Sequence, residues 1–361
     1  MNFCQFSEKI IMKNLSKQEK ILFLTLDFPP LKGGVSRYYH NLVKISNLNI
    51  TVLFQETLGK FWPKWIPLLF KTVKEIKKNN FDFLFIGQVL PLGYIALFIK
   101  SFFGIHYLVF THGMDILFPQ NFWWKKIWLK KILCSADWVV ANSEFTKKEL
   151  ERLGLNSKKI IIIYPCVAFP FQINSIKSTP EEGQTILSVG RLVERKGFDK
   201  VIEAMPKILH FFPNAQYIII GSGRYENELK KMAANLQVDK KVLFFNNLAD
   251  EEISNWYQKC SVFVMPSRQI GPDAEGFGTV FLEAGAYSKP VIAGNSGGVP
   301  EAVINNQTGL IIDPESLNDL EQALIQILSD KDRAREMGEA GRRLVEERFS
   351  CQEQFAKLKE I

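Results

Sequence analysis

The chain contains the stretch ILFLTL at residues 21–26, followed by DFPPLKGG at 27–34 and VSRYYHNLVKI at 35–45. The first run is short and apolar, which is typical of a buried strand, and the third has the spacing of an amphipathic helix. Two glycines between a strand and a helix allow the backbone to approach a phosphate or a sugar closely. The stretch therefore predicts one β–α unit of a parallel sheet.

The same alternation of short apolar runs and longer amphipathic runs continues along the whole chain. It predicts an α/β protein made of two Rossmann-like, doubly wound domains with about six strands each. The expected strands are 21–26, 50–54, 83–86, 107–111, 138–141 and 160–163 in the first half, and 185–189, 217–220, 242–244, 262–265, 290–293 and 309–312 in the second.

Changes in composition indicate where the two domains begin and end. A stretch rich in proline, serine and threonine lies near the middle of the chain and is typical of an interdomain linker. The predicted division is an N-terminal extension 1–20, a first domain 21–169, a linker 170–183, a second domain 184–345 and a C-terminal helix 346–361.

Composition and charge exclude several classes of protein. With 47% hydrophobic and 23% charged residues, the chain does not have the composition of a disordered protein. Five scattered cysteines, none in C-x-x-C spacing, argue against a disulfide framework or a zinc site. The first twenty residues contain no uncharged signal core, so we expect a cytoplasmic protein.

The net charge of +7 is distributed unevenly between the two halves. Residues 1–170 carry +12 and residues 171–361 carry −5, so the first half is expected to meet an anionic partner. A phospholipid surface, a phosphorylated substrate and a nucleic acid all satisfy that charge. The basic residues form no helix-turn-helix, zinc-finger or RNA-recognition pattern, so nucleic acid is the least favoured of the three.

The densest motif of the second half spans 27 residues: EGFG at 275–278, EA at 283–284, KPVIA at 289–293 and GGVPE at 297–301. A helix expected over 277–287 would begin at the glycine turn, whose free N–H groups attract anions and sugar hydroxyls. Glu283 follows Glu275 by eight residues, about two helical turns, which would place both on a similar face. The Gly297-Gly298 turn would let the backbone approach a ligand.

The segment GRLVERKG at 190–197 follows the first strand of the second domain. Arg191 and Lys196 could grip a diphosphate there, the guanidinium in a bidentate manner and the ammonium as a point charge. If a diphosphate leaves during a reaction at this site, these two cations would neutralise its negative charge, so no metal ion is expected.

In the first domain, THGMD at 111–115 follows an expected strand. His112 lies at the carboxyl end of that strand, where doubly wound folds bind ligands, and Asp115 is its neighbour. His112 is therefore a candidate functional residue.

With these motifs, the chain resembles the retaining glycosyltransferases of family 4, group 1 glycosyltransferases with the two-domain GT-B fold. Within that family it is most similar to bacterial GDP-mannose-dependent α-mannosyltransferases, which the loop 268–274 resembles. The resemblance implies that Glu275 and the N–H groups of Gly276, Phe277 and Gly278 hold the donor sugar. Glu283 would bind the nucleotide ribose.

The resemblance assigns further roles as well. Arg191 and Lys196 would assist the leaving group, Gly33 and Gly34 would lie against the donor diphosphate, and His112 would contact the donor sugar or position the acceptor. The second domain would hold the donor and the first the acceptor. One departure is IYPCVA at 163–168, where the family has a stretch like IPNGVD.

The expected function is therefore metal-independent, retaining transfer of mannose or glucose from a donor such as GDP-mannose or UDP-glucose. The acceptor would be a lipid-linked or polysaccharide precursor, and no further cofactor is expected. The alternatives are a sugar synthase or phosphorylase that uses a soluble acceptor, a non-catalytic nucleotide-sugar binding protein, and a nucleic-acid-binding protein.

Aromatic and basic residues crowd residues 60–78 and 121–131, among them Trp123, Trp124 and Trp128. One interpretation is contact with an anionic membrane, at the inner face of the cell membrane, because rings settle at headgroup depth while lysines attract anionic lipid. The other is that the rings pack into the core of the first domain. The sequence leaves both open.

Overall fold

The fold is given by a computed structural model that describes residues 18–31, 33–54, 63, 65–168 and 184–361. The chain divides into two compact units. The first consists of Met1–Pro165 with Cys351–Ile361, and the second of Cys166–Ser350. The predicted linker 170–183 and most of the predicted extension 1–20 lie outside the described residues.

The first unit is built on a parallel six-stranded sheet with the order β2-β1-β3-β4-β5-β6. In β1, Ile21 pairs with Ile50 of β2 and with Phe83 of β3, and the strand is fully buried from Ile21 to Leu24. Burial on both faces is typical of parallel sheets covered by helices. The strands are β1 Lys20–Thr25, β2 Asn49–Phe54, β3 Phe83–Ile86, β4 His106–Thr111, β5 Trp138–Ala141 and β6 Ile160–Ile162.

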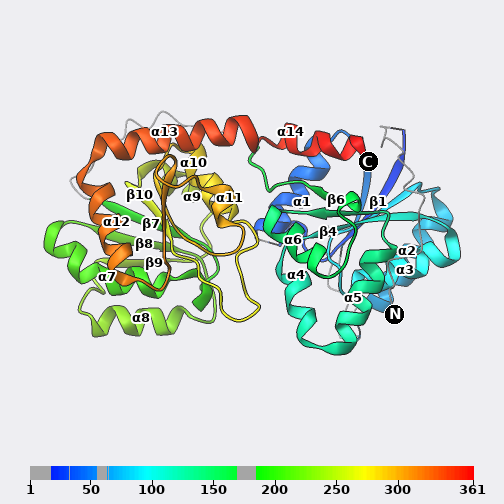
Figure 1. Cartoon of the computed structure of the whole chain (residues 1–361), viewed down its shortest axis with the longest axis horizontal. Coiled ribbons are helices and arrows are strands. Elements are labelled where there is room, and N and C mark those ends of the chain that lie inside the picture. The colour runs from blue at the N-terminus through cyan, green and yellow to red at the C-terminus, as the bar shows by residue number, and fades with distance from the viewer. Residues whose placement is uncertain (1–17, 32, 55–62, 64, 169–183) are drawn as a thin grey trace. The chain divides into compact units, whose positions relative to one another are not determined.

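Helices cover this sheet, as Figure 1 shows. They are α1 Gly34–Ile45, α2 Trp65–Lys78, α3 Leu92–Phe103, α4 Met114–Leu117, α5 Trp123–Ser135, α6 Glu144–Arg152 and α14 Cys351–Ala356, with short 3-10 turns η1 Phe118–Asn121, η2 Ser157–Lys159 and η4 Lys357–Glu360.

The second unit repeats this plan around a parallel sheet with the order β12-β11-β10-β7-β8-β9. Its strands are β7 Thr185–Val189, β8 Gln216–Ile220, β9 Val242–Phe245, β10 Val262–Met265, β11 Val291–Gly294 and β12 Gly309–Ile312. Its helices are η3 Glu194–Lys196, α7 Phe198–Phe211, α8 Glu226–Asn235, α9 Asp250–Lys259, α10 Thr279–Ala286, α11 Val299–Ala302, α12 Leu317–Ser329 and α13 Lys331–Arg348.

The prediction of two doubly wound α/β domains is confirmed. Each of the twelve expected strands is present, and its ends lie within one residue of the predicted ones. The agreement is close because runs of isoleucine, leucine, valine and phenylalanine bounded by turn residues have few alternatives in a buried parallel sheet.

The last eleven residues return to the first unit, which the sequence did not indicate. Helix α14 packs on α1: the Phe355 ring lies 5.6 Å from that of Tyr38, and Asn41 Nδ2 donates to Cys351 Sγ at 3.7 Å. Gln354 Oε1 accepts a hydrogen bond from the backbone N–H of Tyr164. The C-terminal segment is therefore part of the first unit's core.

Two further observations concern the cysteines and the lengths of the helices. Cys134, Cys166 and Cys351 are disulfide-bonded whereas Cys260 is a buried free thiol, so the expectation that scattered cysteines would form no disulfides is wrong. Among the described residues, no helix combines the length and the apolar character needed to cross a membrane.

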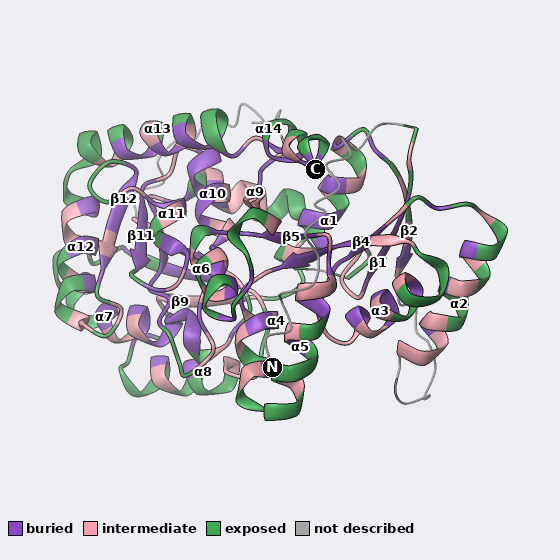
Figure 2. Cartoon of the chain, turned by 45° about the vertical axis from the view of Figure 1, so that its right-hand side comes forward, coloured by how far each residue is buried: buried purple, intermediate pink, exposed green. Residues whose placement is uncertain are grey.

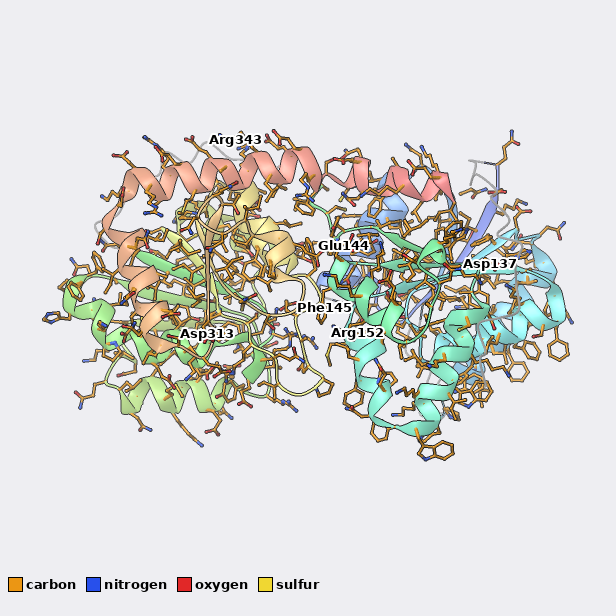
Figure 3. The ribbon with its side chains drawn as sticks, in the orientation of Figure 1. Asp137, Glu144, Phe145, Arg152, Asp313 and Arg343 are labelled. Atoms are coloured by element: carbon orange, nitrogen blue, oxygen red, sulfur yellow. The ribbon has the colours of Figure 1, made fainter. Side chains whose placement is uncertain are left out.

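Asp137, labelled in Figure 3, lies at the amino-terminal edge of the first sheet, next to β5. Its carboxylate accepts bonds from Lys100 Nζ of α3, from His106 Nδ1 and from the backbone N–H of Tyr107 in β4, at 2.8 to 3.0 Å. Burial alone would raise the pKa of Asp137, but the bonds from Lys100 and His106 lower it below its ordinary value. Asp137 thus ties α3 to two strands.

The Asp137→Asn variant should therefore be less stable than the parent protein by about 1–3 kcal/mol at neutral pH. Because the folded-state pKa is lowered, this stability is present above the unfolded pKa of about 3.9 and is lost as the pH falls through the folded value. Urea unfolding across acidic pH measures the difference. Asp332→Asn, at an exposed ion pair with Arg335, is the matched control and should change little.

Candidate functional site

The second unit places its candidate site where the strand order of its sheet reverses. β7 and β10 are neighbours, yet the chain continues from β7 toward β8 on one side and from β10 toward β11 on the other. The loops that follow β7 and β10 therefore diverge from adjacent strand ends, which is where doubly wound sheets bind ligands. The first loop carries η3, and the second runs from Pro266 to Gly278.

A buried group of charges joins these two loops. Glu275 Oε2 accepts a hydrogen bond from Arg195 Nη1 at 2.8 Å and is ion-paired with Lys196 Nζ. Arg195 Nε lies 2.6 Å from Asp273 Oδ1. The side chains of Glu275, Lys196 and Arg195 are only 12%, 10% and 6% exposed. We call Glu275, Lys196, Arg195 and Asp273 the charge cluster.

Burial and pairing shift the ionisation of the charge cluster. Burial alone would raise the pKa of Glu275, but Lys196 and Arg195 outweigh it and lower that pKa to about 2. Burial also lowers the pKa of Lys196, and Glu275 opposes that effect. Glu275 is therefore a carboxylate at any physiological pH. It can accept hydrogen bonds from sugar hydroxyls and is a weak proton donor.

A second ion pair holds the two loops together beside the charge cluster. Arg268 binds Asp199, at the start of α7, through both of its terminal nitrogens at 3.1 and 2.8 Å. Both side chains are buried. In addition, the backbone N–H of Arg268 donates to the carbonyl of Arg195 at 2.8 Å. The bidentate pair thus joins the loop after β10 to α7, and the backbone bond joins that loop to η3.

Close backbone approach explains the glycines around the charge cluster. A Cβ on Gly197, which has φ of +75°, would lie 2.2 Å from the carbonyl oxygen of Pro266. A Cβ on Gly297 would lie 2.0 Å from the carbonyl oxygen of Glu275. The Gly297-Gly298 turn therefore packs against the Glu275 backbone, and Gly298 N–H donates to the Glu275 carbonyl at 2.9 Å. Its observed contact is with protein, whereas the sequence predicted approach to a ligand.

The two cations that the sequence paired differ in burial. Lys196 is buried beside Glu275, whereas Arg191 is exposed after β7 but is near enough for its charge to lower the pKa of Lys196. The guanidinium at Glu275 belongs to Arg195, which the sequence analysis did not select. Arg195 precedes Lys196 in a motif that contains two arginines, and only the η3 turn decides which one points to Glu275. The motifs also missed Asp273 and Arg268, because only the folded loop after β10 brings these side chains to Arg195 and Asp199.

The predicted helix over 277–287 begins two residues late. Gly278 has φ of +93°, and α10 starts at Thr279, so Glu275 precedes the helix. The expectation that Glu275 and Glu283 share a helical face is therefore wrong. Glu283 lies on α10, half-buried, and accepts a hydrogen bond from the Tyr257 hydroxyl at 2.9 Å. The Phe277 side chain is buried against Phe349, so only its backbone is available to a ligand.

In the first unit the strand order reverses between β1 and β3. Gly33 and Gly34 follow β1 and are exposed at the start of α1, whose first turn contains no acidic residue. The N-terminus of a helix carries unpaired N–H groups and a partial positive charge, which suit an anion. The structure thus keeps both glycines where the sequence predicted them, at the carboxyl edge of the sheet.

His112 follows β4 at this same edge and is held by α1. Its Nε2 lies 2.6 Å from the Tyr39 hydroxyl, and that hydroxyl donates its only proton to the Gly87 carbonyl. The hydroxyl must therefore accept from His112, so the imidazole carries its proton on Nε2 and leaves Nδ1 as an acceptor. Burial lowers the pKa of His112 to about 4, which keeps this ring neutral.

The Asp115 side chain holds the loop that carries His112. Its Oδ1 accepts a hydrogen bond from the backbone N–H of His112 at 2.8 Å. Burial raises the pKa of Asp115 to about 7, although backbone N–H groups oppose the shift. Asp115 therefore orients the turn after β4, a role that the sequence did not predict for it.

No set of three histidine, cysteine, aspartate or glutamate side chains in the described part of the chain is arranged to hold a metal ion. The sequence contains an Asp-x-Asp triplet at Asp330-Lys331-Asp332, and both carboxylates are engaged at the start of α13. Asp330 caps the N–H of Arg333, and Asp332 pairs with Arg335. This triplet lies on a different element from the charge cluster.

Comparison with known proteins agrees with this geometry. Residues 47–168 match the family model described as Glycosyltransferase Family 4, and residues 171–344 match that described as Glycosyl transferases group 1. A GDP-mannose-dependent monoacylated α-(1-6)-phosphatidylinositol monomannoside mannosyltransferase of Corynebacterium glutamicum is 30% identical, over 93% of this chain and 96% of the relative. The chain belongs to glycosyltransferase family 4.

Other relatives and solved structures extend the comparison. A GDP-mannose-dependent α-(1-6)-phosphatidylinositol monomannoside mannosyltransferase of Mycobacterium tuberculosis is 30% identical, over 94% of this chain and 97% of the relative. Sucrose-phosphate synthase from Thermosynechococcus elongatus superposes with a TM-score of 0.79 at 22% identity, covering 94% and 97% of the two chains. Anabaena HepE, solved with UDP and glucose, gives 0.77 at 20%, covering 94% and 98%. The predicted GT-B fold is confirmed.

Replacing Arg195 should lower the free energy of unfolding of this glycosyltransferase more than replacing Arg191. Arg195→Met keeps the aliphatic stem but removes the guanidinium from Asp273 and leaves the buried Glu275 with Lys196 alone, so we expect a loss of about 1–3 kcal/mol. The matched change Arg191→Met, at an exposed side chain, should stay within about 0.5 kcal/mol. Chemical unfolding measures both. Equal effects of the two variants would contradict the assignment of Arg195 to the charge cluster.

The tautomer of His112 is directly measurable. We expect ring nitrogen shifts in a ¹⁵N NMR spectrum to show a neutral imidazole protonated on Nε2 that titrates at about pH 4, because burial disfavours its cation. In Tyr39→Phe, which loses the hydroxyl acceptor, the population of the Nε2 tautomer should fall. A wild-type His112 that titrates near pH 6.5, or carries its proton on Nδ1, would show that Tyr39 does not orient it.

Proposed function

We propose that this glycosyltransferase transfers mannose from GDP-mannose to a lipid-linked acceptor with retention of configuration at the anomeric carbon and without a metal ion. The observation that carries the proposal is the charge cluster: a permanently ionised Glu275 and two buried cations at the switch point of the second sheet. The steps below rest on these residues and on the glycine turns of the first unit.

Glu275 would hold the donor sugar as a hydrogen-bond acceptor. Its carboxylate is shared by Lys196 and Arg195, so it is a weak nucleophile, and its lowered pKa makes it a weak general acid. Together with the N–H groups of Gly276, Phe277 and Gly278, it would bind sugar hydroxyls and orient the anomeric carbon. We assign no enzymic nucleophile. The bond from the anomeric carbon to the diphosphate would break with its electron pair going to the diphosphate, the acceptor hydroxyl oxygen would bond to that carbon on the same face, and the hydroxyl proton would pass to a departing phosphate oxygen.

Cationic side chains would stabilise the diphosphate as it departs. Lys196 has three ammonium protons and Glu275 accepts one of them, which leaves donors for phosphate oxygens. Arg191 is exposed after β7 and would add a guanidinium, while Gly33 and Gly34 would offer N–H groups from the first unit. Such preorganised donors stabilise developing negative charge in the way that a divalent ion would.

Glu283 and His112 would complete the substrate contacts. Tyr257 holds the Glu283 carboxylate on α10, where it would bind the ribose hydroxyls. The unprotonated Nδ1 of His112 would accept a hydrogen bond from a sugar hydroxyl of the donor or from the acceptor. Both groups are thus held by tyrosine hydroxyls in a defined orientation.

The choice of mannose and of a lipid-linked acceptor is supported by relatives. The Corynebacterium and Mycobacterium enzymes are named for GDP-mannose and for phosphatidylinositol mannosides, and they align over nearly their whole length. HepE was solved with UDP and glucose, but at 20% identity its likeness to this chain shows the fold and not the donor. GDP-mannose is therefore the donor to test first.

The test compares thermal unfolding with GDP, UDP, ADP and their sugar conjugates. A ligand at about one hundred times its dissociation constant adds about 2.7 kcal/mol, a shift of a few degrees, and we expect it for GDP and GDP-mannose alone. Incubation with GDP-mannose and a polyprenyl-phosphate or phosphatidylinositol acceptor should then give an α-linked product, identified by NMR, in EDTA as well as in Mg²⁺.

Matched lysine variants connect this activity to the charge cluster. Lys196→Met should reduce transfer by at least about a hundredfold, since removal of one preorganised donor has that effect in other enzymes. Lys200→Met, at a half-buried pair with Glu203 on α7, should leave transfer unchanged. A β-linked product would contradict retention, and complete loss of transfer in EDTA would contradict metal independence. The absence of a thermal shift with every nucleotide tested would contradict the donor assignment.

A further inference from the structure

The first unit carries a concentration of exposed aromatic side chains that its fold does not use. Of the fourteen large hydrophobic side chains exposed in the described residues, ten lie on or directly beside α2, α3, η1 and α5. Single exposed apolar residues need no explanation, but a contiguous group does. The ten are Phe70, Phe98, Phe102, Phe103, Phe118, Phe122, Trp123, Trp124, Ile127 and Trp128.

These helices form one face because their rings contact one another. The Tyr94 ring of α3 lies 5.6 Å from Trp65 of α2 and 5.4 Å from Trp128 of α5. One and two turns further along α3, the ring centres of Phe98 and Phe102 are 4.4 Å apart, with the rings tilted by 32°. We call the surface formed by α2, α3, η1 and α5 the aromatic face.

Helix α5 determines how this face meets its surroundings. Leu129, Ile132 and Leu133 are buried toward the unit's core, whereas Trp123, Trp124 and Trp128 are 77%, 45% and 39% exposed. Figure 2 shows α5 largely in the colours of exposed and intermediate residues, and ring side chains project outward from it in Figure 3. The interpretation that the tryptophans pack into the core is therefore wrong for these three.

The charge of the aromatic face is predominantly positive. Apart from Lys100, which is paired with Asp137, helices α2, α3 and α5 carry eight lysines and one acidic residue, Glu75, and α5 alone has four lysines and no acid. Lys125 lies 4.1 Å from the Phe122 ring centre, and Lys131 lies 5.0 Å from that of Trp128. These distances are measured from the ammonium nitrogens, so both lysines make cation–π contacts that hold positive charge beside the exposed rings.

We propose that the aromatic face docks on an anionic bilayer surface, with Trp123, Trp124 and Trp128 at headgroup depth and the lysines of α5 against lipid phosphates. Indole rings prefer that depth, and unopposed lysines are attracted to anionic lipid. Helix α5 has thirteen residues, about 20 Å, and one buried side, so it lies along the bilayer surface. The docking goes beyond the proposed transfer reaction and needs no donor.

The experiment uses the full chain and vesicles of phosphatidylcholine alone or mixed with phosphatidylglycerol. Flotation should recover the protein with the mixed vesicles only, and tryptophan emission should shift to the blue as the indoles leave water. Added salt should weaken binding, since the lysine contribution is electrostatic. Equal binding to both vesicle types, or binding to neither, would overturn the proposal, as would preferential binding to an RNA added in competition.

Variants separate the two parts of the interaction. Trp123→Ser with Trp124→Ser should abolish flotation, whereas Phe211→Ser, at an exposed ring on α7 of the second unit, should not change it. Lys126→Gln and Lys131→Gln should each weaken binding by about fivefold, while Lys240→Gln should have no effect. Trp123→Ser alone, at the most exposed ring, provides a weaker version if the double variant unfolds.

Nucleotide binding on the same variants distinguishes this proposal from the proposed function. The aromatic-face variants should retain the thermal shift with GDP, because none of them touches the charge cluster. Normal flotation with no nucleotide shift would count against the transfer reaction alone. A normal nucleotide shift with flotation that the tryptophan variants do not alter would count against docking alone.

Discussion

A buried carboxylate must be paired, and the pairing of Glu275 organises the second unit. An isolated ionised carboxylate in a protein interior is very costly, so Glu275 remains there because Lys196 and Arg195 reach it. Both cations come from the loop after β7, and Glu275 comes from the loop after β10. The need to satisfy one charge therefore joins the two loops that diverge at the switch point of the sheet.

The glycines of this unit follow from the same constraint. The loops after β7 and β10 approach closely at Gly197, where a Cβ would lie 2.2 Å from the Pro266 carbonyl oxygen, and the loop after β11 approaches Glu275 at Gly297, where a Cβ would lie 2.0 Å from its carbonyl oxygen. On the far side of α10, a Cβ on Gly338 of α13 would lie 2.0 Å from the Ser288 carbonyl oxygen, so α13 packs closely there. Helix α10, which carries Glu283, is thus held between the charge cluster and α13.

In the first unit the corresponding arrangement depends on aromatic packing. The His112 ring contacts Tyr38 at 5.8 Å and Tyr39 at 5.4 Å, and Tyr38 in turn contacts Phe355 of α14. Edge-to-face contacts of this kind favour one ring orientation. The C-terminal segment, remote in sequence, therefore supports the loop that presents His112. The aromatic face is built on other elements of the unit, so catalysis and docking are assigned to separate surfaces.

The sequence by itself determined the two six-stranded parallel sheets, because buried apolar runs separated by amphipathic ones can be satisfied in few other ways. It also predicted that His112 directly follows a strand and that Lys196 and Glu275 lie in loops that follow strands. Only the tertiary structure decided that Arg195 rather than Arg191 pairs with Glu275, that Gly278 delays α10, that residues 351–361 return to the first unit and that the tryptophans of α5 face outward. These outcomes depend on backbone turns and on contacts between distant segments, which local pattern does not encode.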